Sequence, residues 1–133
     1  MGEKNIATLL KSMQPQVLDG TWSFVTVPNG KVVPPGLSPL MTYREPEGVT
    51  LLLDDGDVAK SGLVAAFHSK GISLNVNSSL YAIGFLAAIS DALAKQAMSI
   101  NIVSAFHRDY LFVPVARVDE ALSVLKRLAQ TGR

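Results

Sequence analysis

Two serines and a glycine in the second half of the chain have the types and spacing to bind a small anion. Ser78, Ser79 and Gly84 lie between a segment that predicts a strand and one that predicts a helix. The first N–H groups of a helix have no intrahelical acceptor, so they can bind a carboxylate. With a serine cap, the N–H groups near Leu80 and Tyr81 would receive the carboxylate of an amino acid. The alternative is that the serine only caps the helix and that Gly84 only allows close packing.

Alternating polar residues in the first half could bind a cation. In an unbroken strand Tyr43, Glu45 and Glu47 would share one face, and the two acids could hold an ammonium or guanidinium group. Pro46 between the acids is also typical of an edge strand or bulge that displays solvated charge. Both interpretations stay open at the level of sequence.

His107 and Asp109 are expected at the tip of a hairpin, where they could face a ligand. A solvated turn is the alternative, because aspartate favours turns through local hydrogen bonds to the backbone. Signals for other chemistry are weak. The histidines lack the spacing of metal ligands, cysteine is absent, and neither a Gly-x-Ser-x-Gly nor a Gly-x-x-x-x-Gly-Lys motif occurs. We therefore expect no metal, no cofactor and no catalytic residues.

Composition narrows the class of protein. The chain has 133 residues, of which 48% are hydrophobic and 17% charged, as in a folded globular protein. The net charge is +1 and no basic run occurs, so nucleic acid is not an expected partner. The longest apolar stretch, residues 80–89, is shorter than the roughly 18 residues that span a bilayer. We expect a cytoplasmic protein without a membrane partner.

The elements that must position these residues alternate between helices and strands. Apolar periodicity and turn residues predict helices over 6–13, 58–67, 80–97 and 118–128, and strands over 20–27, 41–45, 49–53, 72–76, 99–106 and 110–115. The second half follows the order β-α-β-β-α, which lacks only the closing strand of a ferredoxin-like unit. The first half offers strands and a short helix for a second, degenerate unit. This pattern predicts an α+β, ferredoxin-like fold in which two βαββαβ-type units share strands, with antiparallel sheets and helices on one face.

At this point the chain resembles a known family. The segments SINI (99–102), SSL (78–80), LFVP (111–114) and YREPEGVT (43–50) carry the resemblance. The second half resembles the ACT domain, and the whole chain resembles small bacterial proteins of unknown function with two ACT-like domains in tandem. Similar pairs occur in the regulatory part of amino-acid-sensitive aspartate kinases and in cytosolic arginine sensors. The resemblance implies one unit over residues 1–70 and a second over 71–133.

The resemblance also implies a function. It suggests an amino-acid-binding regulatory protein, a homodimer and not an enzyme, whose ligand lies between ACT-like units near residues 77–84. The candidate ligand-binding residues are Tyr43, Glu45, Glu47, Ser78, Ser79, Leu80, Ile83, Gly84, His107 and Asp109. Two alternatives stay open. One is a protein–protein interaction or dimerisation module without a small-molecule ligand, and the other is a small enzyme, because one fold can host unrelated chemistries.

Overall fold

A computed structural model describes residues 2–132. The chain divides into two compact units, one of residues 19–69 and the other of residues 1–18 together with 70–133. We call them the central unit and the terminal unit. The predicted boundary between residues 70 and 71 lies beside the observed one between residues 69 and 70. The first 18 residues, however, pack with the second half of the chain.

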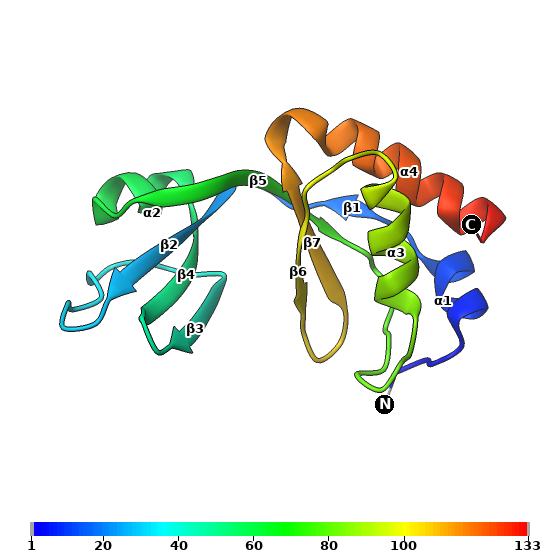
Figure 1. The fold of residues 1–133 in the computed structure, drawn as a ribbon, viewed down its shortest axis with the longest axis horizontal. Helices are drawn as coiled ribbons and strands as arrows, with labels where there is room; N and C mark the ends of the chain where they lie inside the picture. Colours follow the sequence, from blue (N-terminus) through cyan, green and yellow to red (C-terminus); the bar gives the residue numbers. More distant parts are fainter. Residues whose placement is uncertain (1, 133) are drawn as a thin grey trace. The chain divides into compact units, whose positions relative to one another are not determined.

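The central unit is a small antiparallel sheet with one helix. Its strands are β2 (Trp22–Pro28), β3 (Met41–Glu45), β4 (Gly48–Asp54) and the first part of β5 (Ala65–Ser73), and its helix is α2 (Asp55–Ser61). The strand order is β3-β4-β2-β5, and each pair is antiparallel (Figure 1). This is the order of a ferredoxin-like sheet, but residues 29–40 form a loop where the fold would have its first helix.

The core of the central unit follows from alternation along its strands. Val25 and Val27 of β2 point to the same side as Leu51 and Leu53 of β4, and all four are buried. Thr26, between the two valines, is exposed, whereas Leu52, between the two leucines, is buried as well. Val58 of α2 and Leu37 of the 29–40 loop pack against the four core residues.

The helix of the central unit differs from the prediction over residues 58–67. It begins at Asp55, because the Asp54 side chain accepts a hydrogen bond from the Asp57 N–H at 2.8 Å and caps it. It ends at Ser61, because Gly62 adopts a left-handed conformation (φ 66°). Residues 65–67, predicted as helix, belong to β5, which starts earlier than expected.

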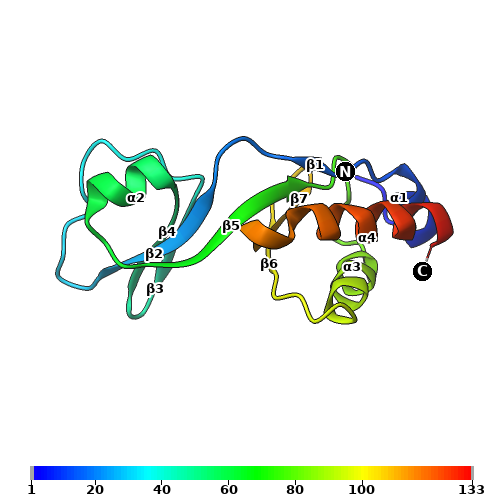
Figure 2. The same cartoon turned by 90° about the horizontal axis from the view of Figure 1, so that it is seen from above.

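The terminal unit is a sheet covered by helices on one side (Figure 1 and Figure 2). Its strand order is β1-β5-β7-β6, again that of a ferredoxin-like fold. The closing strand that is missing after α4 is supplied by β1, near the N-terminus of the chain. The elements are α1 (Ile6–Ser12), β1 (Gln16–Val17), the second part of β5, α3 (Phe85–Ala94), β6 (Asn101–Ser104), β7 (Asp109–Pro114), a 3-10 turn (Val115–Arg117) and α4 (Val118–Thr131).

Both units use β5, so the prediction of ferredoxin-like units that share strands is confirmed. The core of the terminal unit also draws on both ends of the chain, because Leu9 and Leu10 of α1 and its C-cap residue Met13 are buried in a cluster with residues of α3 and α4. The predicted first and last helices and the β6–β7 hairpin are present. Within residues 2–132, no helix combines the length and apolar character needed to cross a membrane.

The third helix is shorter than predicted. The sequence predicts a helix over 80–97, capped by Ser78 or Ser79, but α3 runs from Phe85 to Ala94. Gly84 stands before it in a left-handed conformation (φ 92°), which an L-residue adopts only with strain. The predicted serine cap is therefore wrong, and residues 78–84 form an irregular segment with a bridge at Ser78 and a turn at residues 80–81.

Candidate functional site

A small cavity of about 130 Å³ lies in the terminal unit, at the start of α3. Five of the predicted ligand-binding residues come together in its wall. They are contributed by the turn after β5 and by the first residue of β7. The lining residues are Ser78, Ser79, Leu80, Ala82, Gly84, Phe85, Leu86, Ala87, Ser104 and Asp109.

One side of this cavity carries a buried carboxylate. Asp109 is only 5% exposed, and one of its oxygens, Oδ2, accepts a hydrogen bond from the Ser78 hydroxyl at 2.9 Å. The backbone of Asp109 is held by the Leu74 N–H, which donates to its carbonyl at 3.2 Å. Ser104 faces Asp109 across the β6–β7 hairpin. Asp109 thus lies in a strand, and its predicted place at the exposed hairpin tip is wrong.

The other side of the cavity is the N-terminus of α3. No side chain caps this helix, and the Ala88 N–H is the first to bond within it, to the Gly84 carbonyl at 3.0 Å. The N–H groups of Phe85, Leu86 and Ala87 precede that bond, in the part of a helix where intrahelical acceptors run out. All three residues line the cavity. The wall of the cavity therefore combines hydrogen-bond donors at a positive helix end with the carboxylate residue Asp109.

Ser79 and Tyr81 do not form the anion site that the sequence suggested. The Ser79 hydroxyl accepts a hydrogen bond from the Tyr81 N–H at 3.0 Å, so this N–H is already used in a local turn. Ser78 bonds to Asp109 instead of to a helix N–H. The donors for an anion lie one turn later in the chain, at the true start of α3.

The turn that carries the serines is held by the N-terminal segment. Glu3 forms a parallel bridge with Ser78, in which the Glu3 N–H donates to the Asn77 carbonyl at 3.0 Å and the Ser79 N–H donates to the Glu3 carbonyl at 2.8 Å. The Glu3 carboxylate in turn accepts from the N–H groups of Asn5 and Lys4, which lowers its pKa. These bonds give the cavity wall a backbone support that the sequence did not indicate.

Two of the predicted residues near this turn lie outside the cavity. Ile83 is 84% exposed and is not part of its lining. His107 lines a second, smaller cavity of about 100 Å³ together with Gly2, Asn77 and Phe106, and Leu80 belongs to both cavities. His107 and Asp109 therefore line two different cavities and do not face one ligand together.

The remaining predicted residues belong to the central unit. Tyr43 and Glu45 lie on β3 and are exposed, while Glu47 lies in the turn before β4. The Glu47 carbonyl accepts from the Asn29 N–H at 3.2 Å, which ties this turn to the end of β2. β3 ends at Glu45, as the predicted strand over 41–45 does, so Glu47 does not share a strand face with Tyr43 and Glu45.

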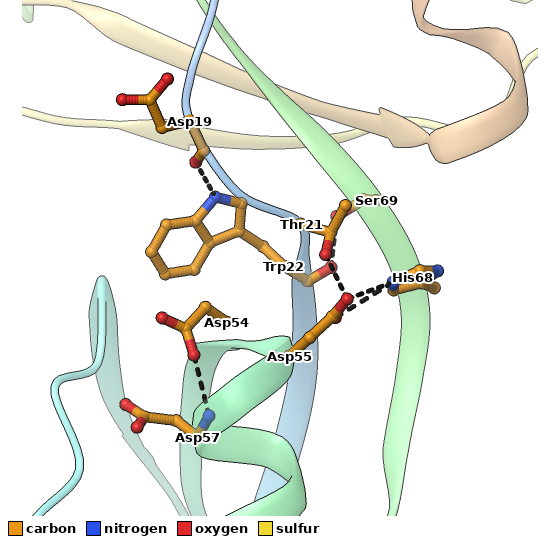
Figure 3. A network of polar contacts seen from close by, with 8 residues as sticks. All are labelled: Asp19, Thr21, Trp22, Asp54, Asp55, Asp57, His68 and Ser69. Carbon is orange, nitrogen blue, oxygen red and sulfur yellow. Dashed lines mark hydrogen bonds and ion pairs between the residues drawn. The ribbon is translucent and has the colours of Figure 1, made fainter.

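The central unit contains a polar network of its own (Figure 3). His68 Nε2 lies 3.0 and 3.3 Å from the two carboxylate oxygens of Asp55, which also accepts from the Thr21 hydroxyl. The Ser69 hydroxyl donates to the Trp22 carbonyl at 2.8 Å, beside a shift in the β2–β5 register. More than half of the Asp55 and His68 side chains is exposed, so we assign the network to the attachment of α2 to β5.

A buried acid links α2 to the loop that replaces the missing helix. The Asp57 carboxylate accepts from the Ser38 N–H at 2.8 Å, and this bond lowers its pKa against the opposing effect of burial. Lys60 Nζ lies 3.4 Å from the other carboxylate oxygen. Across residues 2–132, no three histidine, aspartate or glutamate side chains gather in a way that could hold a metal ion.

Two family models match the chain. Both are described as ACT domain, and they cover residues 1–70 and 68–127. The chain belongs to the ACT-domain family. The two matches meet in β5, the strand that both units share. No match to a curated protein was found.

Several solved structures share this fold. A Vibrio cholerae protein of unknown function, described as a possible transport protein, is 33% identical with a TM-score of 0.83, over 98% of this chain and 100% of that one. An Agrobacterium tumefaciens protein is 12% identical with a TM-score of 0.75, over 88% and 89% of the two chains. The ligand-free regulatory subunit of aspartate kinase from Thermus thermophilus is 11% identical with a TM-score of 0.61, over 89% and 97%.

Sequence reasoning missed several residues of the cavity in this ACT-domain protein. Phe85, Leu86 and Ala87 were placed inside a longer helix, although the glycine before them is a sign that a helix begins there. Ser104 carries no sequence signal of its own, because only the hairpin register brings it opposite Asp109. Ala82 carries no sequence signal, because its place depends on the turn after Ser79.

Proposed function

We propose that this ACT-domain protein is a regulatory module that binds a free α-amino acid in the cavity of the terminal unit. One observation carries the proposal. The same cavity combines an uncapped helix N-terminus with a buried carboxylate, and these are complementary to the two charged groups of an α-amino acid.

The ligand would bind as a zwitterion. Its carboxylate would accept hydrogen bonds from the N–H groups of Phe85, Leu86 and Ala87, while its ammonium would donate to Asp109. Ser78 already holds one oxygen of Asp109 and would keep that carboxylate oriented. A molecule with only one of the two charged groups would leave either the helix end or Asp109 unpaired.

Binding would regulate by changing the packing of the unit. The cavity joins β7, the turn over residues 78–84 and the start of α3, so a ligand that contacts all three favours one arrangement of them. The proposed role is signalling without catalysis. It is supported by ACT-domain matches over both halves of the chain and by the fold shared with an aspartate kinase regulatory subunit.

A thermal-shift screen against the common amino acids tests the proposal. At about 100 times its dissociation constant, a ligand adds about 2.7 kcal/mol to the free energy of unfolding and raises the midpoint by several degrees. For the amino acid that binds, the amine and the carboxylic acid that each lack one charged group should give no shift. A folded protein with no response to any amino acid would contradict the proposal.

A second candidate function is protein–protein interaction, including a homodimer. Four large apolar side chains of the terminal unit are mostly exposed, namely Leu80, Tyr81, Ile83 and Phe106. Exposed apolar groups that lie near one another are typical of interaction sites. Analytical ultracentrifugation of the wild type and of Ile83→Asp tests this role, because a dimer built on this surface should dissociate in the variant.

A further inference from the structure

The dimensions and charges of the cavity in the terminal unit limit which amino acid it can accept. Its volume of about 130 Å³ is well below the roughly 300–1,000 Å³ of pockets for drug-sized ligands. Phe85, which is buried in the core of the unit, forms part of the wall and cannot move aside cheaply. The space left beside the α-carboxylate and the α-ammonium is therefore small.

The charge of the lining is as restrictive as its size. Of the ten described lining residues, Asp109 alone has an ionisable side chain. Once the ligand's α-ammonium is paired with Asp109, no further side chain in the wall can neutralise a charge. A lysine, arginine, aspartate or glutamate ligand would find no oppositely charged side chain in the wall for its own side-chain charge, so the lining favours an uncharged side chain.

The remaining wall suits a short side chain. Ala82, Leu86 and Ala87 contribute apolar surface, and the Ser104 hydroxyl lies at the end of the adjoining strand. A methyl group on the ligand can contact this apolar surface, and a hydroxyl group on the ligand can form a hydrogen bond with Ser104. We infer that the ligand is a small uncharged amino acid of the glycine, alanine and serine class, an inference that rests on the proposed binding of an amino acid.

Isothermal titration of the full chain with individual amino acids tests this inference. We expect glycine, alanine or serine to bind at least ten times more tightly than lysine, arginine or glutamate. If a charged or large amino acid binds as tightly, the inference on ligand class is overturned while the proposed function stands. If no amino acid binds to the folded protein, the proposed function itself fails.

A pair of variants on α3 tests whether the ligand binds in this cavity. Ala87 and Ala94 are both exposed alanines on this helix, but only Ala87 lines the cavity. Ala87→Leu should fill the cavity and weaken binding of the small amino acid by more than tenfold, whereas Ala94→Leu should bind as the wild type does. Circular dichroism confirms that both variants are folded. Unchanged binding by Ala87→Leu would overturn the assignment of the ligand to this cavity.

Discussion

Asp109 is the side chain on which ligand binding should depend most. A buried carboxylate needs partners, and among the described residues Ser78 supplies a hydrogen bond to one of its oxygens but no charge. Charge-assisted hydrogen bonds contribute about 1.5–3 kcal/mol. We therefore expect Asp109→Asn to weaken amino-acid binding by roughly 10- to 100-fold, as measured by isothermal titration.

The matched control for this change is Asp119→Asn. Asp119 is an exposed aspartate in the first turn of α4 and does not line the cavity, so its variant should bind the ligand normally. If the Asp109 and Asp119 variants bound equally well, the proposed ammonium contact would be excluded.

At the scale of elements, the start of α3 depends on one glycine. Gly84 has φ 92°, and an alanine there would enter a left-handed conformation that costs about 1–2 kcal/mol. Its Cβ would also approach Ile6 Cδ1 to 2.7 Å, although that methyl group can move. Urea unfolding of Gly84→Ala should show a free energy of unfolding lower by about 1–2 kcal/mol.

A second glycine-to-alanine change should shift the free energy of unfolding in the opposite direction. Gly56 lies within α2, and a Cβ there would come no closer than 3.5 Å to Asp54 Oδ1. Because alanine favours a helix over glycine, Gly56→Ala should raise the free energy of unfolding by roughly 0.5–1 kcal/mol. A loss of stability in Gly56→Ala, or none in Gly84→Ala, would show that backbone conformation does not control these sites.

The attachment of the 29–40 loop to α2 should depend on pH. The Ser38 N–H lowers the pKa of Asp57 from its ordinary value of 3.8, so the folded state binds its proton less readily than the unfolded state. Asp57 therefore contributes stability above pH 3.8, and this contribution is lost as pH falls through the lower, folded-state pKa. Urea unfolding of the wild type and of Asp57→Asn, from pH 7 to pH 3, measures this contribution to stability.

The wild type should be the more stable protein near neutral pH, and its advantage should shrink in the acidic part of the range. A difference that stays constant with pH would mean that the ionised Asp57 carboxylate contributes nothing through the Ser38 bond.

Elements were easier to predict than their ends. Apolar periodicity predicted α1 and α4, and the strands of β4 and of the β6–β7 hairpin were predicted close to where the structure has them. The C-terminal end of α3 differs from the prediction because a tertiary contact follows it. Ala97 adopts φ 53° after the helix, and Arg117 donates from its guanidinium to the Gln96 and Ala97 carbonyls at 2.9 and 3.0 Å. A bond from a residue so far along the chain leaves no local signal.

At the scale of the whole molecule, the terminal unit needs the first residues of the chain. Residues 1–18 supply β1, the buried Leu9 and Leu10 of α1, and the buried Met13 that follows the helix. Full burial of such side chains stabilises by about 1.5–3 kcal/mol each, and a domain has only about 5–15 kcal/mol in total. A fragment of residues 70–133 should therefore be unfolded alone and should fold when a peptide of residues 1–18 is added, as followed by circular dichroism.

A peptide with Leu9→Asp is the control, because it would bury a charge in the same core and should not restore folding. Independent folding of the 70–133 fragment would contradict the prediction and would mean that β5, α3, β6, β7 and α4 form a sufficient core by themselves.

The sequence by itself determined the family, the ferredoxin-like order of elements and the turn after β5 as a region of interest. These depend on local periodicity, turn residues and short motifs, which are properties of neighbouring residues. Only the tertiary structure decided that β1 closes the terminal unit, that Asp109 is buried against Ser78, and that the uncapped start of α3 lines the same cavity as Asp109. Those features join residues that are distant along the chain, and pairing across a sheet brings them together through hydrogen bonds and burial that no local pattern records.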